Sequence, residues 1–200
     1  MSTAPSAAVA HARPAGARAL ATLAGALVVA LAAQFALPLP GTPVPFTFSP
    51  LAVLVVGALL GPRIGALSLI TYLAMGAAGL PVFAPLGAPG FARLFGPTGG
   101  YLLAYPLAAA FAGWAVRRTG GQADSDSPSA RPSVRLFVLA CLGGMVIIFV
   151  GGLSQLIVLT GNLTSAFAAG VLPFVLADLA KVVLASLIAQ RLFPVTRALS

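Results

Sequence analysis

Long apolar stretches alternate with short breaks rich in Pro, Gly or Arg along almost the whole chain. Six such stretches lie at residues 19–37, 46–61, 64–80, 99–116, 136–159 and 171–192. A helix needs about 20 apolar residues to cross the hydrocarbon core of a bilayer, with a range of about 17–25. The pattern therefore predicts an all-α integral membrane protein, a bundle of six transmembrane helices.

The breaks fix the limits of the stretches. Pro38 and Pro40 end the first stretch, and Pro62 with Arg63 separates the second from the third. The second stretch is short for a complete crossing. The first stretch follows a basic segment, as in a signal peptide, but it exceeds the usual apolar length of about 7–15 residues. We therefore expect it to be a retained helix.

The arginines predict the orientation of the six helices. If the N-terminus is cytoplasmic, only Arg93 lies in an outside segment. The inside segments then hold Arg13, Arg18, Arg63, Arg117, Arg118, Arg131, Arg135, Arg191 and Arg197. Cytoplasmic segments of membrane proteins carry an excess of Arg and Lys. Both termini are therefore expected in the cytoplasm, with a tail at 1–18, a membrane domain at 19–193, a cytoplasmic linker at 119–133 and a second tail at 194–200.

Composition excludes several classes of protein. The chain is 60% hydrophobic and 7% charged, with a mean hydropathy of +1.05, whereas soluble domains carry about a quarter charged residues. The formal charge of +8 comes from residues that border apolar stretches, so it indicates membrane topology and not nucleic-acid binding. One cysteine, Cys141, and one histidine, His11, argue against an internal disulfide, a multi-Cys metal site or His-based catalysis. We expect no metal and no cofactor.

Two ionisable residues stand inside the last apolar stretch. Asp178 and Lys181 are spaced i, i+3, so they share one helical face and can form an ion pair. Charges within a membrane cost at least about 2.5 kcal/mol each on insertion scales, which favours a functional role over a pair that only neutralises itself. Asp178 would lie about 10 Å from the outer end of its helix. The sequence predicts a polar ligand site that opens outward.

Two further segments are candidates for function. Residues 76–105 form an outside connection rich in Gly and Pro, with Phe83, Phe91, Phe95 and Tyr101 as flat apolar surface and Arg93 as the sole outside cation. This segment is either a wall of the site or an ordinary loop with interfacial aromatics. In the first predicted helix and just before it, Ala17, Ala21 and Gly25 recur every four residues. Such spacing allows close helix approach, either within the bundle or to a partner protein.

Five segments together resemble the BioY family, the biotin-specific substrate-capture subunits (S components) of energy-coupling-factor transporters. The segments are TPVPFT at 42–47, LLGPRIGALSLITYLAMG at 59–76, GLPVFA at 79–84, GPTGGYL at 96–102 and DLAK at 178–181. The resemblance covers about residues 19–193. It implies a six-helix membrane bundle that binds biotin near the outer face, in the bacterial cytoplasmic membrane.

The resemblance also implies site residues and partners. Asp178 and Lys181 would contact the biotin head. The glycine-rich motifs would form the walls of the pocket. The residues implied there are Gly79, Phe83, Gly99, Gly100 and Tyr101, together with Thr47. The family commonly has Gln two residues beyond this Thr, where the chain has Ser49. From charge and topology we assign Arg93 to the biotin carboxylate. The chain has no nucleotide motif and is not expected to be an enzyme, so a transmembrane coupling protein and two ABC ATPases are the implied partners.

Other functions remain open at this point. An S component for a different vitamin would share the fold, and ligand binding would distinguish it. A polytopic membrane enzyme acting on lipids usually needs clustered carboxylates for a metal, whereas Asp178 is the only acidic residue in the apolar stretches. A structural subunit without a ligand would leave the Asp178–Lys181 pair without a purpose. Biotin capture is the function that the sequence predicts.

Overall fold

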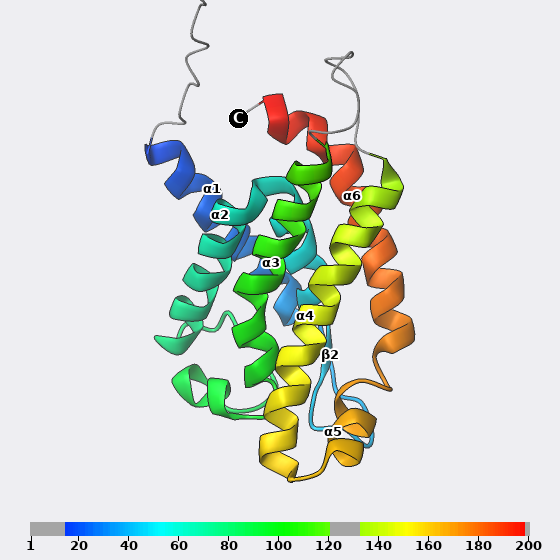
Figure 1. Cartoon of the computed structure of the whole chain (residues 1–200). Coiled ribbons are helices and arrows are strands. Elements are labelled where there is room, and N and C mark those ends of the chain that lie inside the picture. Colours follow the sequence, from blue (N-terminus) through cyan, green and yellow to red (C-terminus); the bar gives the residue numbers. More distant parts are fainter. Residues whose placement is uncertain (1–14, 121–132, 199–200) are drawn as a thin grey trace, which may run out of the picture.

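A computed structural model describes residues 15–120 and 133–198 and is mostly helical (Figure 1). The helices are α1 (Ala15–Gln34), α2 (Ser49–Ala77), α3 (Gly99–Gly120), α4 (Val134–Thr160), α5 (Leu163–Gly170) and α6 (Val175–Ala198), with a short 3-10 helix η1 (Gly90–Phe95). Two short strands, β1 (Ala36–Leu37) and β2 (Phe46–Thr47), pair antiparallel. Four helices are long and apolar enough to cross a membrane, or five if α5 and α6, bent by 51°, form one broken span. The chain is a multi-pass membrane protein.

The α2 helix contains the break that the sequence predicts between its second and third apolar stretches. Gly61 has φ 80° and ψ 179°, and Pro62 follows it. Residues 49–60 and 62–77 therefore form two arms that fold back on one another, which Figure 1 shows as opposite directions of the ribbon. A Cβ on Gly65 would lie 3.0 Å from the Cα of Gly57. Eight residues of a straight helix would separate these positions by about 12 Å.

The limits of the first two predicted stretches need correction. Residues 36–37 and 46–47 belong to the strand pair and not to membrane helices, because Pro38 and Pro40 end the helical path and the chain returns as a hairpin. The last stretch, 171–192, begins with a turn that follows α5, so α6 starts at Val175. The predicted helices at 99–116 and 136–159 are confirmed, with slightly longer bounds. Of the predicted tail and linker, residues 1–14 and 121–132 lie outside the described residues.

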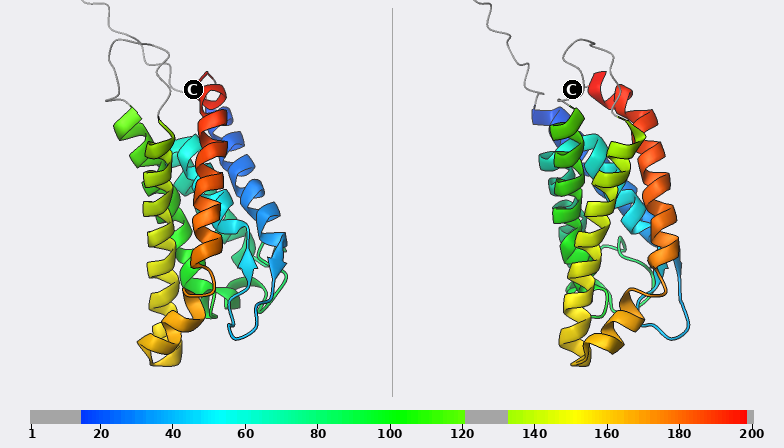
Figure 2. Two further views of the ribbon diagram at one scale, coloured as in Figure 1. Left: turned by 90° about the vertical axis from the view of Figure 1, so that its right-hand side faces the viewer. Right: turned by 45° about the vertical axis from the view of Figure 1, so that its right-hand side comes forward.

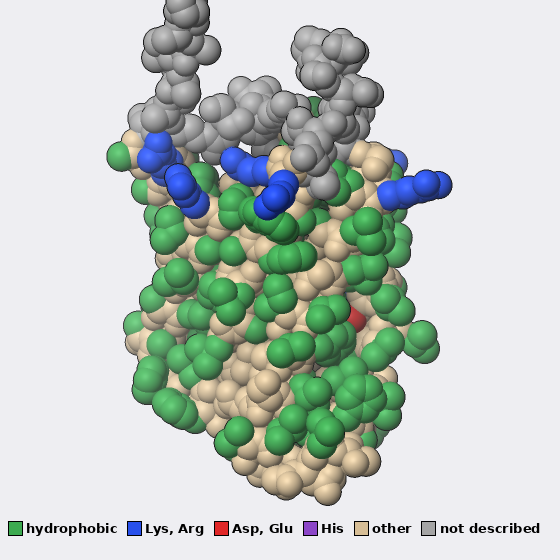
Figure 3. All heavy atoms as spheres, in the orientation of Figure 1, with side chains coloured by type: hydrophobic (Ala, Val, Ile, Leu, Met, Phe, Trp, Pro, Cys, Tyr) green, Lys and Arg blue, Asp and Glu red, His purple; other side chains and the backbone are tan. Residues whose placement is uncertain are grey.

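The helices are arranged so that the loops gather at two opposite ends of the bundle. Figures 1 and 2 show the start of α1, the end of α3, the start of α4 and the end of α6 at one end. The strand pair, η1 and α5 lie at the other end. We call the first the basic end, because it carries Arg63, Arg117, Arg118, Arg135 and Arg191, and the second the hairpin end. On the face in Figure 3, Lys and Arg side chains are confined to the basic end.

Candidate functional site

A cavity of about 610 Å³, its mouth included, lies between the helices toward the hairpin end. The cavity is lined by residues of the hairpin and of every long helix except α1, together with the η1 region. They are Val44, Pro45, Thr47, Ser49, Pro50, Tyr72, Phe83, Ala84, Arg93, Thr98, Tyr101, Leu102, Tyr105, Ile148, Phe149, Phe174, Asp178 and Lys181.

An ion pair forms one polar side of the cavity. The Nζ of Lys181 donates to the Oδ1 of Asp178 at 2.6 Å, and the two residues are 4% and 5% exposed. Both stand in the first turns of α6, which begins just after Pro173. The Lys181 Nζ also lies 3.8 Å from the ring centroid of Phe46 on β2, a cation–π contact. The predicted pair therefore exists and faces the cavity, held by a helix on one side and by the hairpin on the other.

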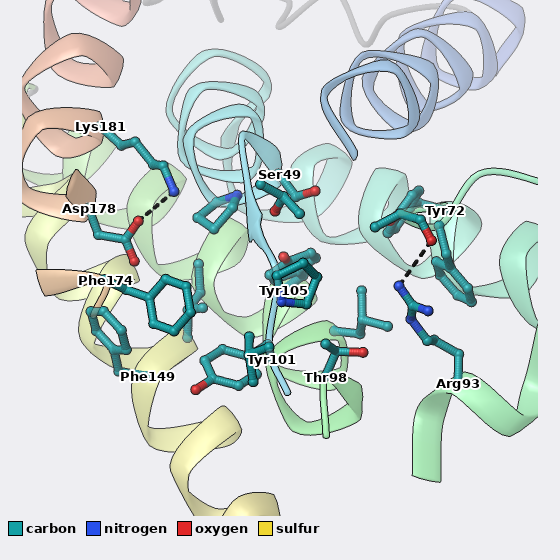
Figure 4. Close-up of a pocket in the computed structure, with 18 residues that line it drawn as sticks. Ser49, Tyr72, Arg93, Thr98, Tyr101, Tyr105, Phe149, Phe174, Asp178 and Lys181 are labelled. Carbon is teal, nitrogen blue, oxygen red and sulfur yellow. Dashed lines mark hydrogen bonds and ion pairs between the residues drawn. The ribbon is translucent and has the colours of Figure 1, made fainter. Parts of the chain in front are cut away.

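Arg93 forms a second polar side, away from the ion pair (Figure 4). It comes from η1 and is 4% exposed. Its terminal nitrogens donate to the backbone carbonyls of Ala84, Leu86 and Ala88. Within the described part of the chain, its Nε has no hydrogen-bond partner. Burial lowers the pKa of Arg93 below its ordinary value. A buried cation with an unused donor is suited to an anionic ligand group.

Aromatic side chains line the space between the two polar sides. Tyr101 donates its hydroxyl to the carbonyl of Gly170 at 2.6 Å, which fixes its ring against the segment before α6. Tyr72 packs edge-on against Phe83 at 5.4 Å and lies stacked with Tyr105 at 6.5 Å between centroids. Phe174 and Phe149 lie near Asp178 in Figure 4. This middle part of the cavity is suited to flat, apolar ligand groups.

The structure thus brings together six of the predicted site residues, and three others lie elsewhere. Thr47, Phe83, Arg93, Tyr101, Asp178 and Lys181 line the cavity, whereas Gly79, Gly99 and Gly100 are not among the lining residues described. Gly79 is exposed, with φ +94° in a turn. Gly99 and Gly100 are buried where a Cβ would meet the carbonyls of Leu94 and Gly151. Gly99 and Gly100 thus permit close packing of α3, and a role of the three glycines in the pocket stays a prediction.

Sequence reasoning did not select Tyr72, Tyr105, Thr98, Phe149 and Phe174 as site residues. Tyr105 follows Tyr101 by one helical turn, so the i, i+4 spacing could have found it. Tyr72 stands in one of the family segments but within an apolar stretch. No sequence spacing shows that it meets Phe83 across a loop.

The small residues of α1 divide into exposed and buried positions. Ala17 is exposed and Ala21 is half-buried. Gly25 is buried, and a Cβ there would collide with Ser68 on the second arm of α2. Gly25 is therefore used for packing within the chain, and docking of a partner at these positions stays a prediction.

Comparisons with known proteins agree with this architecture. The model of the BioY family matches residues 6–198. A relative from Pyrococcus horikoshii, named "Probable biotin transporter BioY", is 38% identical over 75% of this chain and 81% of its own length. "Biotin transporter BioY" of Thermotoga maritima is 35% identical over 77% of this chain and 83% of its own.

The fold also matches a solved structure, that of the "S-component for biotin from an ECF-type ABC transporter". The TM-score is 0.76 at 22% sequence identity, over 90% of this chain and 94% of the solved one. The family match spans nearly the whole sequence, and each of the five segments that resemble the family contributes residues to the cavity. The chain belongs to the BioY family.

Proposed function

We propose that this chain is the biotin-binding subunit of an energy-coupling-factor transporter in the bacterial cytoplasmic membrane. It is a transport subunit and not an enzyme. The observation that carries the proposal is one cavity with an Asp178–Lys181 pair on one side, Arg93 on the other and aromatic rings between them. The relatives named biotin transporters support the choice of ligand.

The chemistry of biotin matches the order of groups along the cavity. Its ureido ring has two N–H donors and one carbonyl acceptor, so it can donate to the carboxylate of Asp178 and accept from the ammonium of Lys181. The thioether ring and the aliphatic tail are apolar and would lie among Tyr72, Tyr101 and Phe174. The carboxylate of the tail would then reach Arg93, whose Nε is the unused donor.

The proposed orientation places the hairpin end outside the cell and both termini in the cytoplasm. The arginines at the basic end support it, because cytoplasmic loops carry the excess of positive charge (Figure 3). The two arms of α2 count as separate crossings in this proposal. Together with α1, α3, α4 and α6 they give six crossing segments, an even number consistent with termini on one side. The cavity then opens toward the outside, where biotin is captured.

Transport requires partners in this proposal. The sequence has no nucleotide-binding motif, so a transmembrane coupling protein and two ABC ATPases would supply the energy. The α1 helix is the proposed docking element. Ala17 and Ala21 permit close approach, and Leu20, Leu27 and Leu31 are 70%, 52% and 67% exposed on the same helix.

Uptake of radiolabelled biotin tests the function. The chain is expressed with its coupling protein and ATPases in cells that lack their own biotin uptake. We expect the wild type and Ser186→Ala to accumulate biotin and Asp178→Asn to fail. Ser186 is the matched control, because it is a buried polar residue of the same helix whose hydroxyl donates to the carbonyl of Val182, and it is not among the residues that line the cavity. Absence of uptake by the wild type, with all subunits present in the membrane, would contradict the proposal.

A further inference from the structure

A cluster of arginines lies at the basic end, where the two arms of α2 meet the last turns of α3. Arg63 follows the reversal at Pro62 and is exposed, as are Arg117 and Arg118. Arg117 donates to the carbonyl of Leu60 at 3.0 Å and so holds the reversal in place. The guanidinium of Arg118 lies 5.2 Å from the ring centroid of Trp114, one turn earlier in α3. Arg63 and Arg118 therefore bring two exposed cations to the edge of one helix pair.

An apolar surface groove begins directly below this cluster. It is lined by Pro62 of α2 and by Ala110, Phe111 and Trp114 of α3. The rings of Phe111 and Trp114 lie 5.8 Å apart and form one wall. Trp114 is 45% exposed although it is the largest apolar side chain of α3. A tryptophan in such a position is typical of the interface between lipid headgroups and hydrocarbon.

Toward the middle of the membrane, the same face of α3 borders a second hollow, which it forms together with α4. Leu107 and Leu103 follow Trp114 at helical spacings and are 66% and 52% exposed. The distance along the helix from Trp114 to Leu103 is about 16 Å at 1.5 Å per residue. This is close to half of the hydrocarbon thickness of about 30 Å, which is the depth that one acyl chain occupies.

We propose that this groove is a binding site for one anionic phospholipid. Arg63 and Arg118 pair with its phosphate, Trp114 packs at the level of its glycerol, and one acyl chain lies along Ala110, Leu107 and Leu103. Charge complementarity selects the occupant, because basic pockets between transmembrane helices bind acidic lipid headgroups. Only the assignment to the cytoplasmic leaflet rests on the orientation proposed above. Lipid binding itself is independent of biotin.

Native mass spectrometry of the intact chain, released from detergent, tests the site. The probes are dioleoyl phosphatidylglycerol and dioleoyl phosphatidylcholine, which have the same acyl chains. We expect the wild type to bind one molecule of phosphatidylglycerol more tightly than one molecule of phosphatidylcholine. The double variant Arg63→Gln with Arg118→Gln should lose most of that preference, roughly 25-fold at about 1 kcal/mol for each arginine.

Two further variants separate this site from general attraction to a basic surface. Arg18→Gln with Arg191→Gln also removes two exposed charges from the basic end, but from α1 and α6, and should keep the wild-type preference. Ala110→Leu fills the groove, keeps all charges and should weaken the binding. The proposal is overturned if the Arg63 and Arg118 variant binds like the wild type, or if the Arg18 and Arg191 variant loses as much preference.

Discussion

Asp178→Asn keeps the shape of the side chain but removes its charge, and it leaves the ammonium of Lys181 buried without a counter-ion. The geometry and burial of the pair determine how much free energy this change costs. The two groups lie 2.6 Å apart and each residue is at most 5% exposed, so water cannot replace the lost partner. Breaking a buried pair in this way costs about 3–5 kcal/mol. We expect biotin affinity to fall by at least about two decades, since about 1.4 kcal/mol corresponds to a factor of ten.

The double variant Asp178→Asn with Lys181→Met separates binding from folding. It contains no unpaired charge, so its thermal stability should return close to that of the wild type. The single variant should melt at least about 6 °C lower, at about 2–4 °C per kcal/mol for a chain of this size. Biotin binding should stay lost in the double variant, because the acceptor for the ureido N–H groups and the donor to its carbonyl are both changed.

The assay is a thermal melt and a biotin titration of the wild type, both single variants and the double variant in the same detergent. Ser186→Ala on the same helix serves as the control and should change neither value strongly. A double variant that binds biotin like the wild type would refute the reasoning. The pair would then be structural only, and the cavity would bind its ligand through other groups.

Three further predictions follow from the other contacts. Arg93→Gln should remove the preference of the protein for biotin over biotinamide in competition titrations, since the amide lacks the charge that Arg93 is proposed to bind; an unchanged preference would exclude that contact. Gly100→Ala should lower the melting temperature strongly, because its Cβ would collide with the carbonyl of Gly151, whereas Gly16→Ala has open space and should not. Ala21→Arg should reduce co-purification with the coupling protein and leave biotin binding intact; equal losses of both would indicate misfolding instead.

The sequence predicts most of the fold because long apolar stretches must cross the membrane as helices. The break at Pro62 and the ion pair at i, i+3 spacing are local features, and both are present in the structure. The strand pair at 36–37 and 46–47 was missed, since two-residue strands leave no periodic pattern and Phe46 continues the apolar run.

The remaining site residues depend on contacts between distant segments. Tyr72 meets Phe83 only because the second arm of α2 turns back at Ala77, and Gly25 is buried only because that arm packs on α1 through Ser68. Neither contact can be derived from spacing along the chain. Glycines identified from motifs were assigned to the pocket, but Gly100 serves the approach of α3 to α4. A motif thus shows that a small residue is required and not what lies against it.

Isothermal titration calorimetry of the purified chain with biotin tests the central claim most directly. The protein is prepared from cells grown without biotin, and thiamine and riboflavin are titrated under the same conditions. We predict saturable binding of one biotin per chain and no saturable heat with the other two vitamins. No heat with biotin for the folded protein, or equal binding of another vitamin, would contradict the account.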